Sequence, residues 1–354
     1  MTEAAGEVVA LAEATSPGLP PGISEAEAAQ MSYAAERARA SRRHFSSLSR
    51  RDKVVLWIIV GVPTAIHVVF VWIPAISTIV LSFTNWNGIV GVGDIRFVGF
   101  RNYWEIFTVF EKDFWSAAIN NGFLVVFLFL VPTAFGIVLA YLLDKNLRGS
   151  AVYQSIYYTP VVLSLAVVGF IWKSVLYSPK QGLFSTILGR TGQGNQIDWL
   201  GDQSHLISFG STYGISKNFA AILVAIAWRH TGYIMVLYLA GLKSVDPALR
   251  EAAAIDGCTE WQAFRRVVFP AMKPINVIVA VITVIEALRA YDIIFALKSP
   301  RGMEVLSILV TDNLIGEGGG NVGRGSAYGV LLLLLCVGFI IWFLANNYRQ
   351  ERRS

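Results

Sequence analysis

Ionisable and aromatic side chains interrupt two otherwise apolar segments of this chain. Arg229, His230 and Tyr233 lie near the middle of one segment, and Glu286 and Arg289 lie near the middle of the next. A charged side chain in hydrocarbon costs about 2.5–3.5 kcal/mol on insertion scales, so those that remain usually face a cavity. Glu286 and Arg289 can pair with each other or with Arg229, which leaves donors and acceptors for a polar solute. The alternative is a buried ion pair that locks the two segments together, or a contact with another subunit.

The sequence contains no motif that is typical of a catalytic site or a metal site. The four histidines are scattered, and neither an HExxH motif nor a GxxxxGK[ST] phosphate loop is present. Cys258 and Cys336 are far apart, which argues against a disulfide framework and against a metal site. We therefore predict no catalytic residue, no metal ligand and no cofactor bound by this chain.

Composition places the protein in the membrane. Hydrophobic residues make up 55% of the 354 residues and charged residues 15%, and the mean hydropathy is +0.55. Soluble domains carry about 25% charged residues. The net charge of +5 arises from basic residues beside apolar segments, as membrane topology places them. We therefore expect an integral membrane protein surrounded by lipid, and no nucleic-acid partner.

Six segments are long and apolar enough to be transmembrane helices. A helix needs about 20 apolar residues to cross about 30 Å of hydrocarbon. The predicted spans cover residues 54–82, 117–143, 153–177, 219–242, 275–297 and 326–346. Prolines at 63, 74, 132 and 160 are tolerated as kinks because neighbouring groups can satisfy the freed carbonyls. The expected fold is an all-α polytopic membrane protein.

The distribution of positive charge predicts the orientation. Most of the 29 lysine and arginine residues lie before the first span, in the loops between spans 2 and 3 and between spans 4 and 5, or in the C-terminal tail. Cytoplasmic loops carry such an excess. Both termini are therefore predicted to be cytoplasmic.

The first 52 residues are expected to be a cytoplasmic extension, with residues 53–350 forming the transmembrane domain. Residues 1–40 are rich in Ala, Glu, Ser, Pro and Gly, a composition that favours disorder. No apolar core of a signal peptide precedes Val54, so we expect no cleavable secretory leader.

A polar stretch, EAAAIDGCTEWQAFRRVVFPAMKP, separates the fourth and fifth spans at residues 251–274. Asp246 and Pro247 form a helix start, and Gly257 divides the stretch into two short helices. We interpret residues 246–274 as a cytoplasmic knob; the alternative is an amphipathic helix lying in the membrane interface. The side chains expected to pack the knob onto the membrane domain are those of Trp261, Phe264 and Val268.

This stretch resembles the EAA loop of permease subunits of ABC importers, in which E-A-A, a glycine and I-x-L-P follow at fixed spacing. The matching residues are Glu251-Ala252-Ala253, Gly257, Val267 and Phe269-Pro270. EAAAIDGCTEWQAFRRVVFP looks like the carbohydrate branch, and FVGFRNYWEIF at residues 97–107 is similar to a motif of maltose and glycerol-phosphate type permeases. The chain departs from the family at LKSPRG, residues 297–302, and at GEGGGNVGRG, residues 316–325.

The resemblance implies a type I ABC importer permease fold with six transmembrane helices and a cytoplasmic EAA coupling loop. The chain would form a heterodimeric pathway with a second permease. Two cytoplasmic ATPase subunits would bind ATP and magnesium, and an extracytoplasmic binding protein would deliver a sugar. The residues implied in ATPase coupling are Glu251, Ala252, Ala253, Asp256 and Gly257. Maltose-type permeases line their sugar site from spans on either side of this loop, which favours Arg229, His230, Tyr233, Glu286 and Arg289 as the substrate path.

Two other functions remain open at this point. An ion-coupled secondary transporter would use Glu286 as a proton or cation site, but it leaves the EAA stretch unexplained. Inverted repeats and glycine-broken helices at the midplane would support it, and neither is clear in the sequence. An ABC permease for a phosphorylated or non-sugar solute also fits, because basic residues lie in spans 4 and 5. The outer loops, rich in Gly, Asn and aromatic residues, can dock an external partner.

Overall fold

The computed structural model describes residue 33 and residues 49–89, 91–145, 147–191, 194–209, 213–297, 303–316 and 320–351. The chain divides into two compact units, Met1–Pro74 and Ala75–Ser354. Nearly all of the predicted disordered extension, residues 1–52, lies outside the described residues and remains a prediction, as does LKSPRG for the most part.

The first unit contains a helix that continues into the second. It consists of α3 (Arg50–His67), the π-helical turn η1 (Val68–Trp72) and α4 (Ile73–Leu81). Ser49 and Asp52 form a capping box, with each side chain bonded to the other residue's backbone N–H. The π-helical turn directly precedes Pro74, which lacks the N–H that a regular helix would use. The kink predicted at Pro74 thus coincides with the irregularity, whereas the helix begins before the predicted span, at Arg50.

The second unit is built around three long helical segments. The first combines α6 (Glu111–Leu128), η3 (Phe129–Thr133) and α7 (Ala134–Asp144), and the others are α11 (Lys217–Ser244) and α18 (Val322–Glu351). Together with Arg50–Leu81, four helices among the described residues are long and apolar enough to cross a membrane. Two bent helix pairs raise the number to as many as six if each pair is one span.

The first bent pair lies in a predicted single span, and the second lies where the polar stretch was predicted to end and the fifth span to begin. The first joins α8 (Ser150–Val162) to α9 (Leu165–Phe170) and η4 (Ile171–Leu176) at 97°. The second joins α13 (Glu260–Ala263), η5 (Phe264–Val268) and α14 (Phe269–Ala271) to α15 (Lys273–Leu288) at 75°. At the first bend the Ser164 hydroxyl accepts a hydrogen bond from the Val167 N–H at 3.4 Å and caps a new helix.

The span predicted over residues 275–297 is interrupted. Helix α15 ends at Leu288, a turn follows, and α16 (Asp292–Leu297) begins a separate helix. The Asn121 side chain of α6 donates to the Ala287 carbonyl at 2.9 Å and accepts from the Leu306 N–H at 2.8 Å. A helix end in an apolar environment needs such a partner. Asn121 therefore makes the interruption possible, and sequence periodicity carried no sign of it.

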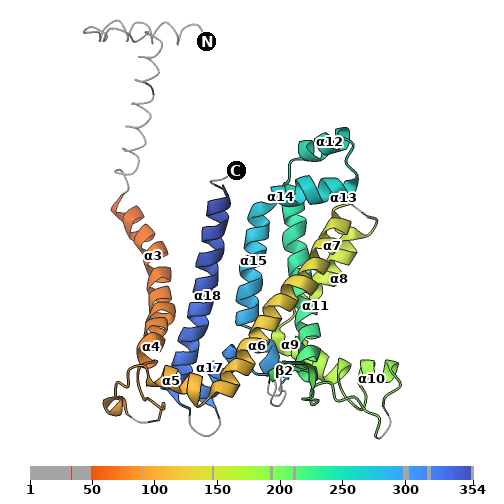
Figure 1. Ribbon diagram of the computed structural model, residues 1–354. Coiled ribbons are helices and arrows are strands. Elements are labelled where there is room, and N and C mark those ends of the chain that lie inside the picture. The colour runs from red at the N-terminus through yellow and green to blue at the C-terminus, as the bar shows by residue number, and fades with distance from the viewer. Residues whose placement is uncertain are drawn as a thin grey trace, which may run out of the picture. The chain divides into compact units, whose positions relative to one another are not determined.

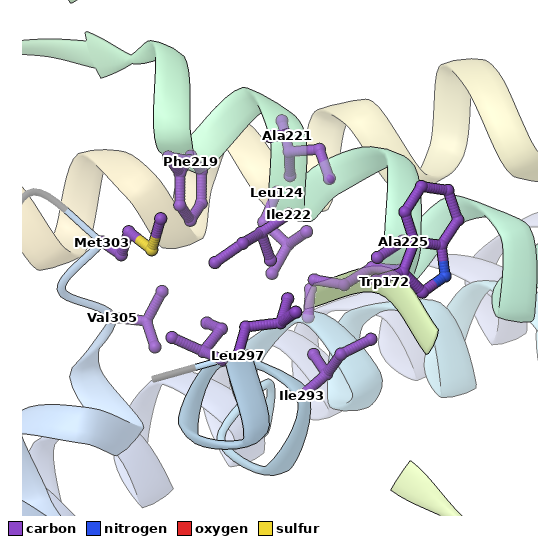
Figure 2. Close-up of a cluster of buried hydrophobic side chains, with 14 of the residues drawn as sticks. Leu124, Trp172, Phe219, Ala221, Ile222, Ala225, Ile293, Leu297, Met303 and Val305 are labelled. Atoms are coloured by element: carbon purple, nitrogen blue, oxygen red, sulfur yellow. The ribbon is translucent and has the colours of Figure 1, made fainter. Parts of the chain in front are cut away.

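Two apolar clusters follow one another along α11. The first packs the N-terminal half of α11 against α6, α9 and α16, with Leu124, Phe219, Ile222 and Leu297 fully buried (Figure 2). The second packs the C-terminal half of α11 against α7 and η5. A Cβ atom on Gly136 would collide with Ile234, which shows how closely α7 approaches α11. The polar centre of α11 lies between the two clusters.

A third apolar cluster surrounds α5 (Arg101–Thr108), α17 (Leu306–Ile315) and α18, with Ile106 and Tyr328 buried. Helices α5 and α17 lie at one end of the second unit with α10 (Leu183–Ile187), whereas α12 (Pro247–Ile255), α13 and α14 lie at the opposite end; α18 runs between the two ends, with its C-terminal end near the knob helices (Figure 1). A short 3-10 turn, η2, covers Val92–Asp94.

A small antiparallel hairpin, which the all-α prediction did not include, precedes α11. Strand β1 (His205–Phe209) pairs with β2 (Tyr213–Ser216). Asp202 anchors the base of the hairpin through the Ser204 hydroxyl and N–H and through Lys217 Nζ at 3.1 Å. These hydrogen bonds, from Ser204 first and then Lys217, lower the pKa of Asp202 to about 2. The carboxylate is therefore ionised at any physiological pH.

Candidate functional site

A cavity of about 150 Å³ opens beside the centre of α11. It lies between the two apolar clusters along that helix, where α11 faces α15, α16 and α9. Its lining consists of Leu165, Ile226, Arg229, His230, Ile285, Glu286, Arg289, Ala290, Asp292 and Ile293. Four of the five residues predicted to form a substrate path therefore meet at one place.

Arg229 and Glu286 form a single, long contact across this cavity. Arg229 Nη1 lies 3.3 Å from Glu286 Oε2, and the Glu286 side chain is 40% exposed. The buried Nε of Arg229 has no hydrogen-bond partner among the described residues. A guanidinium has five N–H donors, and an unmade bond on a buried donor costs about 1–3 kcal/mol. The pair thus retains hydrogen-bonding capacity that a polar solute can use.

Glu286 pairs with Arg229 rather than with Arg289 among the described residues. Arg289 occupies the turn that ends α15, where its side chain is exposed, and Asp292 begins α16. The prediction of Arg289 near the middle of a span was therefore wrong in its local structure, because α15 ends one residue earlier. Arg289 still lines the cavity.

His230 joins the two helices that form the cavity wall. Its Nε2 lies 3.3 Å from the Thr283 hydroxyl of α15, and both residues are buried. Polar side chains that bond across helices hold membrane proteins together. His230 therefore positions Arg229, its neighbour in sequence, relative to α15.

Tyr233 lies apart from the other four candidates. It is half-buried, packs against the second apolar cluster and is not among the residues that line the cavity. Trp228 packs edge-on against Trp172, with ring centroids 5.8 Å apart. The i, i+4 spacing puts Arg229 and Tyr233 on one face of α11, but the residues of α11 that line the cavity are Ile226, Arg229 and His230.

Two residues that position the cavity were missed from the sequence. Asn121 holds the end of α15, and Asn120 donates to the Glu304 carbonyl at 2.8 Å. Both asparagines are buried in α6. An amide in an apolar helix is costly unless it finds partners. Adjacent asparagines within a predicted span were therefore the signal that could have identified them.

The polar stretch after α11 forms two short helices, as predicted. Asp246 accepts from the Ala248 N–H at 2.9 Å at the start of α12. Gly257 has φ 77°, the Cys258 N–H donates to the Ala253 carbonyl, and the Gly257 N–H donates to the Ala254 carbonyl. These bonds define a Schellman motif that ends α12. We call the segment from α12 to α14 the knob.

The knob exposes most of the residues implied in coupling. Glu251, Ala252, Asp256 and Gly257 are exposed, whereas Ala253 is buried. Ile255, an apolar side chain, is 86% exposed. On the opposite side Phe264 and Val268 are buried in the second apolar cluster, as predicted, while Trp261 is mostly exposed and stacks on Phe264. The knob therefore has one face attached to the helices and one face open to a partner.

The family profile described as "Binding-protein-dependent transport system inner membrane component" matches residues 132–352. The chain belongs to this family. It is a permease of the ABC type, an inner membrane component and not an enzyme. Membership in this family decides against the secondary transporter as an alternative.

Curated relatives match most of this permease. The xylose/arabinose import permease protein XacH of Haloferax volcanii is 29% identical over 82% of this chain and 87% of its own length. The osmoprotective compounds uptake permease protein GgtC of Synechocystis is 30% identical over 79% of this chain and 94% of its own length. A crystal structure of a bacterial ABC transporter that imports the acidic polysaccharide alginate aligns with a TM-score of 0.67 and 19% identity, covering 87% of this chain and 99% of that one. This last similarity shows a shared fold.

Proposed function

We propose that this chain is one of two permease subunits of an ATP-driven sugar importer. The observation that carries the proposal is the exposed knob, held on the helices by Phe264 and Val268 and presenting Glu251, Ala252 and Asp256 outward. Two ATPase subunits would bind this knob and its counterpart on the second permease. ATP and magnesium would bind to those subunits, since this chain has no phosphate loop.

In the proposed arrangement six spans cross the membrane. The first bent pair, α8 to η4, forms one of them, and α15 with α16 forms another, whereas both termini and the knob are cytoplasmic. Two features support it. Lysine and arginine are concentrated in the segments assigned to the cytoplasm. The C-terminal end of α18 also lies at the same end of the second unit as the knob (Figure 1).

The cavity is proposed to be this subunit's part of the sugar path. Sugar hydroxyls would accept from Arg229 and Arg289 and donate to Glu286, whereas His230 holds the wall. Ligand pockets usually enclose about 300–1,000 Å³, so a cavity of about 150 Å³ is too small to surround a sugar alone. The second permease would supply the remaining contacts.

A neutral sugar fits the cavity better than a phosphorylated one. Two arginines, Arg229 and Arg289, face two carboxylates, Glu286 and Asp292, in the lining. A site for a phosphate would present an excess of cationic donors. Relatives named for xylose/arabinose and for trehalose/maltose transport support the same substrate class.

The end opposite the knob is proposed to receive the sugar-binding protein. Strand β1 of the hairpin that precedes α11 is exposed along its whole length, and Asp202 anchors the base of the hairpin. Such ordered surface segments held by a rigid scaffold are suited to docking.

The experiment combines purification with transport. An affinity-tagged chain is purified from its native membranes, and uptake of radiolabelled xylose, arabinose, trehalose and maltose is compared in deletion and complemented strains. We expect an ATPase and a second permease to copurify, and uptake of at least one sugar to require the chain. Purification without any ATPase, together with unchanged uptake of all four sugars in the deletion strain, would contradict the proposal.

A further inference from the structure

Two adjacent residues at the end of α7 hold the two halves of the knob. Asp144 Oδ2 lies 2.6 Å from Arg250 Nη1 of α12, and Lys145 Nζ lies 2.5 Å from Glu260 Oε2 at the start of α13. Asp144 and Lys145 have opposite charge, and each pairs with a different helix of the knob. We call these two pairs the ionic clamp.

The Arg250–Asp144 pair is the more enclosed part of the clamp. The Asp144 side chain is 13% exposed. Arg250 also donates from Nη2 to the Leu242 carbonyl at 2.9 Å, so that one guanidinium joins α12 to α7 and to the last turn of α11. Charge-assisted bonds with two donors fix geometry as well as contributing energy.

The Lys145–Glu260 pair lies in solvent. The Glu260 side chain is 77% exposed. Lys145 also lies over the Tyr141 ring, 4.8 Å from its centroid. Exposed ion pairs contribute little to stability because solvent screens them. Its role is therefore to set the orientation of α13 rather than to hold the fold together.

The knob contacts α7 on one side and leaves a cavity on the other. This cavity has a volume of about 260 Å³, with Leu242, Ala254, Cys258 and Phe264 among its lining residues. Apolar packing fixes the knob on the side of Phe264 and Val268, where the centroid of the Tyr141 ring of α7 lies 4.9 Å from that of Phe264, whereas α12 faces the cavity. The ionic clamp bridges this open side.

We infer that Asp144 and Lys145 are positioning residues that transmit movement of the knob to α7. The inference rests on the proposed function of the knob. Movement passes onward because α7 packs closely on α11 at Gly136 and Ile234, and α11 carries Arg229 at the cavity. A clamp with merely structural importance would instead change protein levels.

The experiment reverses the charges singly and together in the complete transporter. The single variants are Asp144→Arg and Arg250→Asp, or Lys145→Glu and Glu260→Lys, and each pair is then combined. Lys243→Glu is the matched control, because this exposed lysine in the last turn of α11 has no ion pair among the described residues. Uptake is measured with whichever of xylose, arabinose, trehalose and maltose the wild type takes up fastest. ATP hydrolysis and the amount of bound ATPase are measured on the purified complex.

Cys258 provides a direct readout of the clamp. It is half-buried and lines the cavity that the clamp closes. Maleimide labelling of Cys258, in a background in which Cys336 is replaced by Ser, reports whether the knob has moved away from α7. Opening the clamp is expected to speed this labelling.

We expect either single reversal in the Arg250–Asp144 pair to lower uptake about tenfold at normal membrane level, consistent with coupling energies of linked charged groups. ATPase stays bound and Cys258 labels faster, while the combined reversal restores both. Reversals in the exposed Lys145–Glu260 pair lower uptake and speed Cys258 labelling in the same way but by less, and Lys243→Glu changes neither.

Wild-type uptake in the single reversals would overturn the inference, as would a failed rescue at normal protein level. Absence of ATPase from the wild-type complex would instead overturn the proposed function, and it is seen before any variant is made.

Discussion

The cavity and the knob use the same kind of ion pair in different ways. In the cavity, Arg229 reaches Glu286 through one contact of 3.3 Å and leaves a buried Nε without a partner among the described residues. At the knob, Arg250 contacts Asp144 at 2.6 Å and uses a second nitrogen for the Leu242 carbonyl. An unsatisfied donor is costly unless a ligand uses it. Under the proposed function, the unpartnered donor in the cavity is available to a solute, whereas the fully bonded Arg250 suits the knob to transmitting movement.

Helix ends differ between the two regions in the same way. Helix α12 is closed by its own residues, through the Schellman motif at Gly257. At the end of helix α15 beside the cavity, the Ala287 carbonyl is bonded by Asn121, which is far away in sequence. The knob is therefore a locally specified element, and the cavity depends on long-range contacts that can change as the helices move.

The largest effect is expected from Gly257→Val in the knob. Space around Gly257 is open, so the penalty comes from its φ of 77°, which a β-branched residue adopts at a cost of about 1–2 kcal/mol or more. Uptake should be abolished and bound ATPase reduced at normal membrane level. Gly257→Asn is the matched control, since asparagine tolerates this conformation. Equal transport by the two variants would remove the knob from the coupling account.

Glu286→Gln tests the cavity side of the comparison. It keeps the size of the side chain but removes the charge, and a hydrogen bond to a charged group contributes about 1.5–3 kcal/mol, so uptake should fall roughly tenfold or more. Tyr233→Phe is the control, because Tyr233 packs against the second apolar cluster. Radiolabelled uptake in cells measures both. A larger effect of Tyr233→Phe than of Glu286→Gln would move the substrate path to a different part of α11.

Asn121→Ala should affect stability more than Asn120→Ala. The first leaves the Ala287 carbonyl and the Leu306 N–H without a partner, at about 1–3 kcal/mol each, whereas the second frees only the Glu304 carbonyl from its bond to Asn120. The Tm of the purified chain, measured in one detergent, should therefore fall further for Asn121→Ala. The opposite order would show that α15 ends for another reason.

The smallest effect is expected from pH at the exposed pair of the clamp. The hydrogen bond with Lys145 lowers the pKa of Glu260 below its usual 4.5, and the bond with Glu260 raises the pKa of Lys145 above its usual 10.5. The pair is thus lost only as pH falls through the lowered pKa or rises through the raised one. Maleimide labelling of Cys258, corrected for thiol ionisation, should show no clamp opening between these limits. A change near pH 7 would contradict this.

The sequence contained the information for local features. Asp246-Pro247 and Gly257 correctly predict the boundaries of α12, because caps and left-handed glycines act within a few residues. The four long candidate spans follow from apolar length. The apolar attachment of Phe264 and Val268 follows from helical spacing.

Features that depend on distant residues were not available from the sequence. The end of α15 requires Asn121, and the position of Tyr233 outside the cavity depends on how α7 and α11 pack. The choice of Arg229 over Arg289 as the partner of Glu286 is likewise set by the approach of α11 and α15. Periodicity describes each helix by itself and carries no such distances.

One measurement tests the separation of the two regions most directly. Sugar uptake, bound ATPase and ATP hydrolysis stimulated by the sugar-loaded binding protein are determined on the same reconstituted complexes carrying Glu286→Gln or Gly257→Val. The account predicts that Glu286→Gln loses uptake but keeps its ATPase and the stimulated hydrolysis, whereas Gly257→Val loses uptake together with both. Parallel loss of all three in Glu286→Gln would contradict the assignment of this residue to the sugar path and favour an ion pair that merely holds α11 and α15 together.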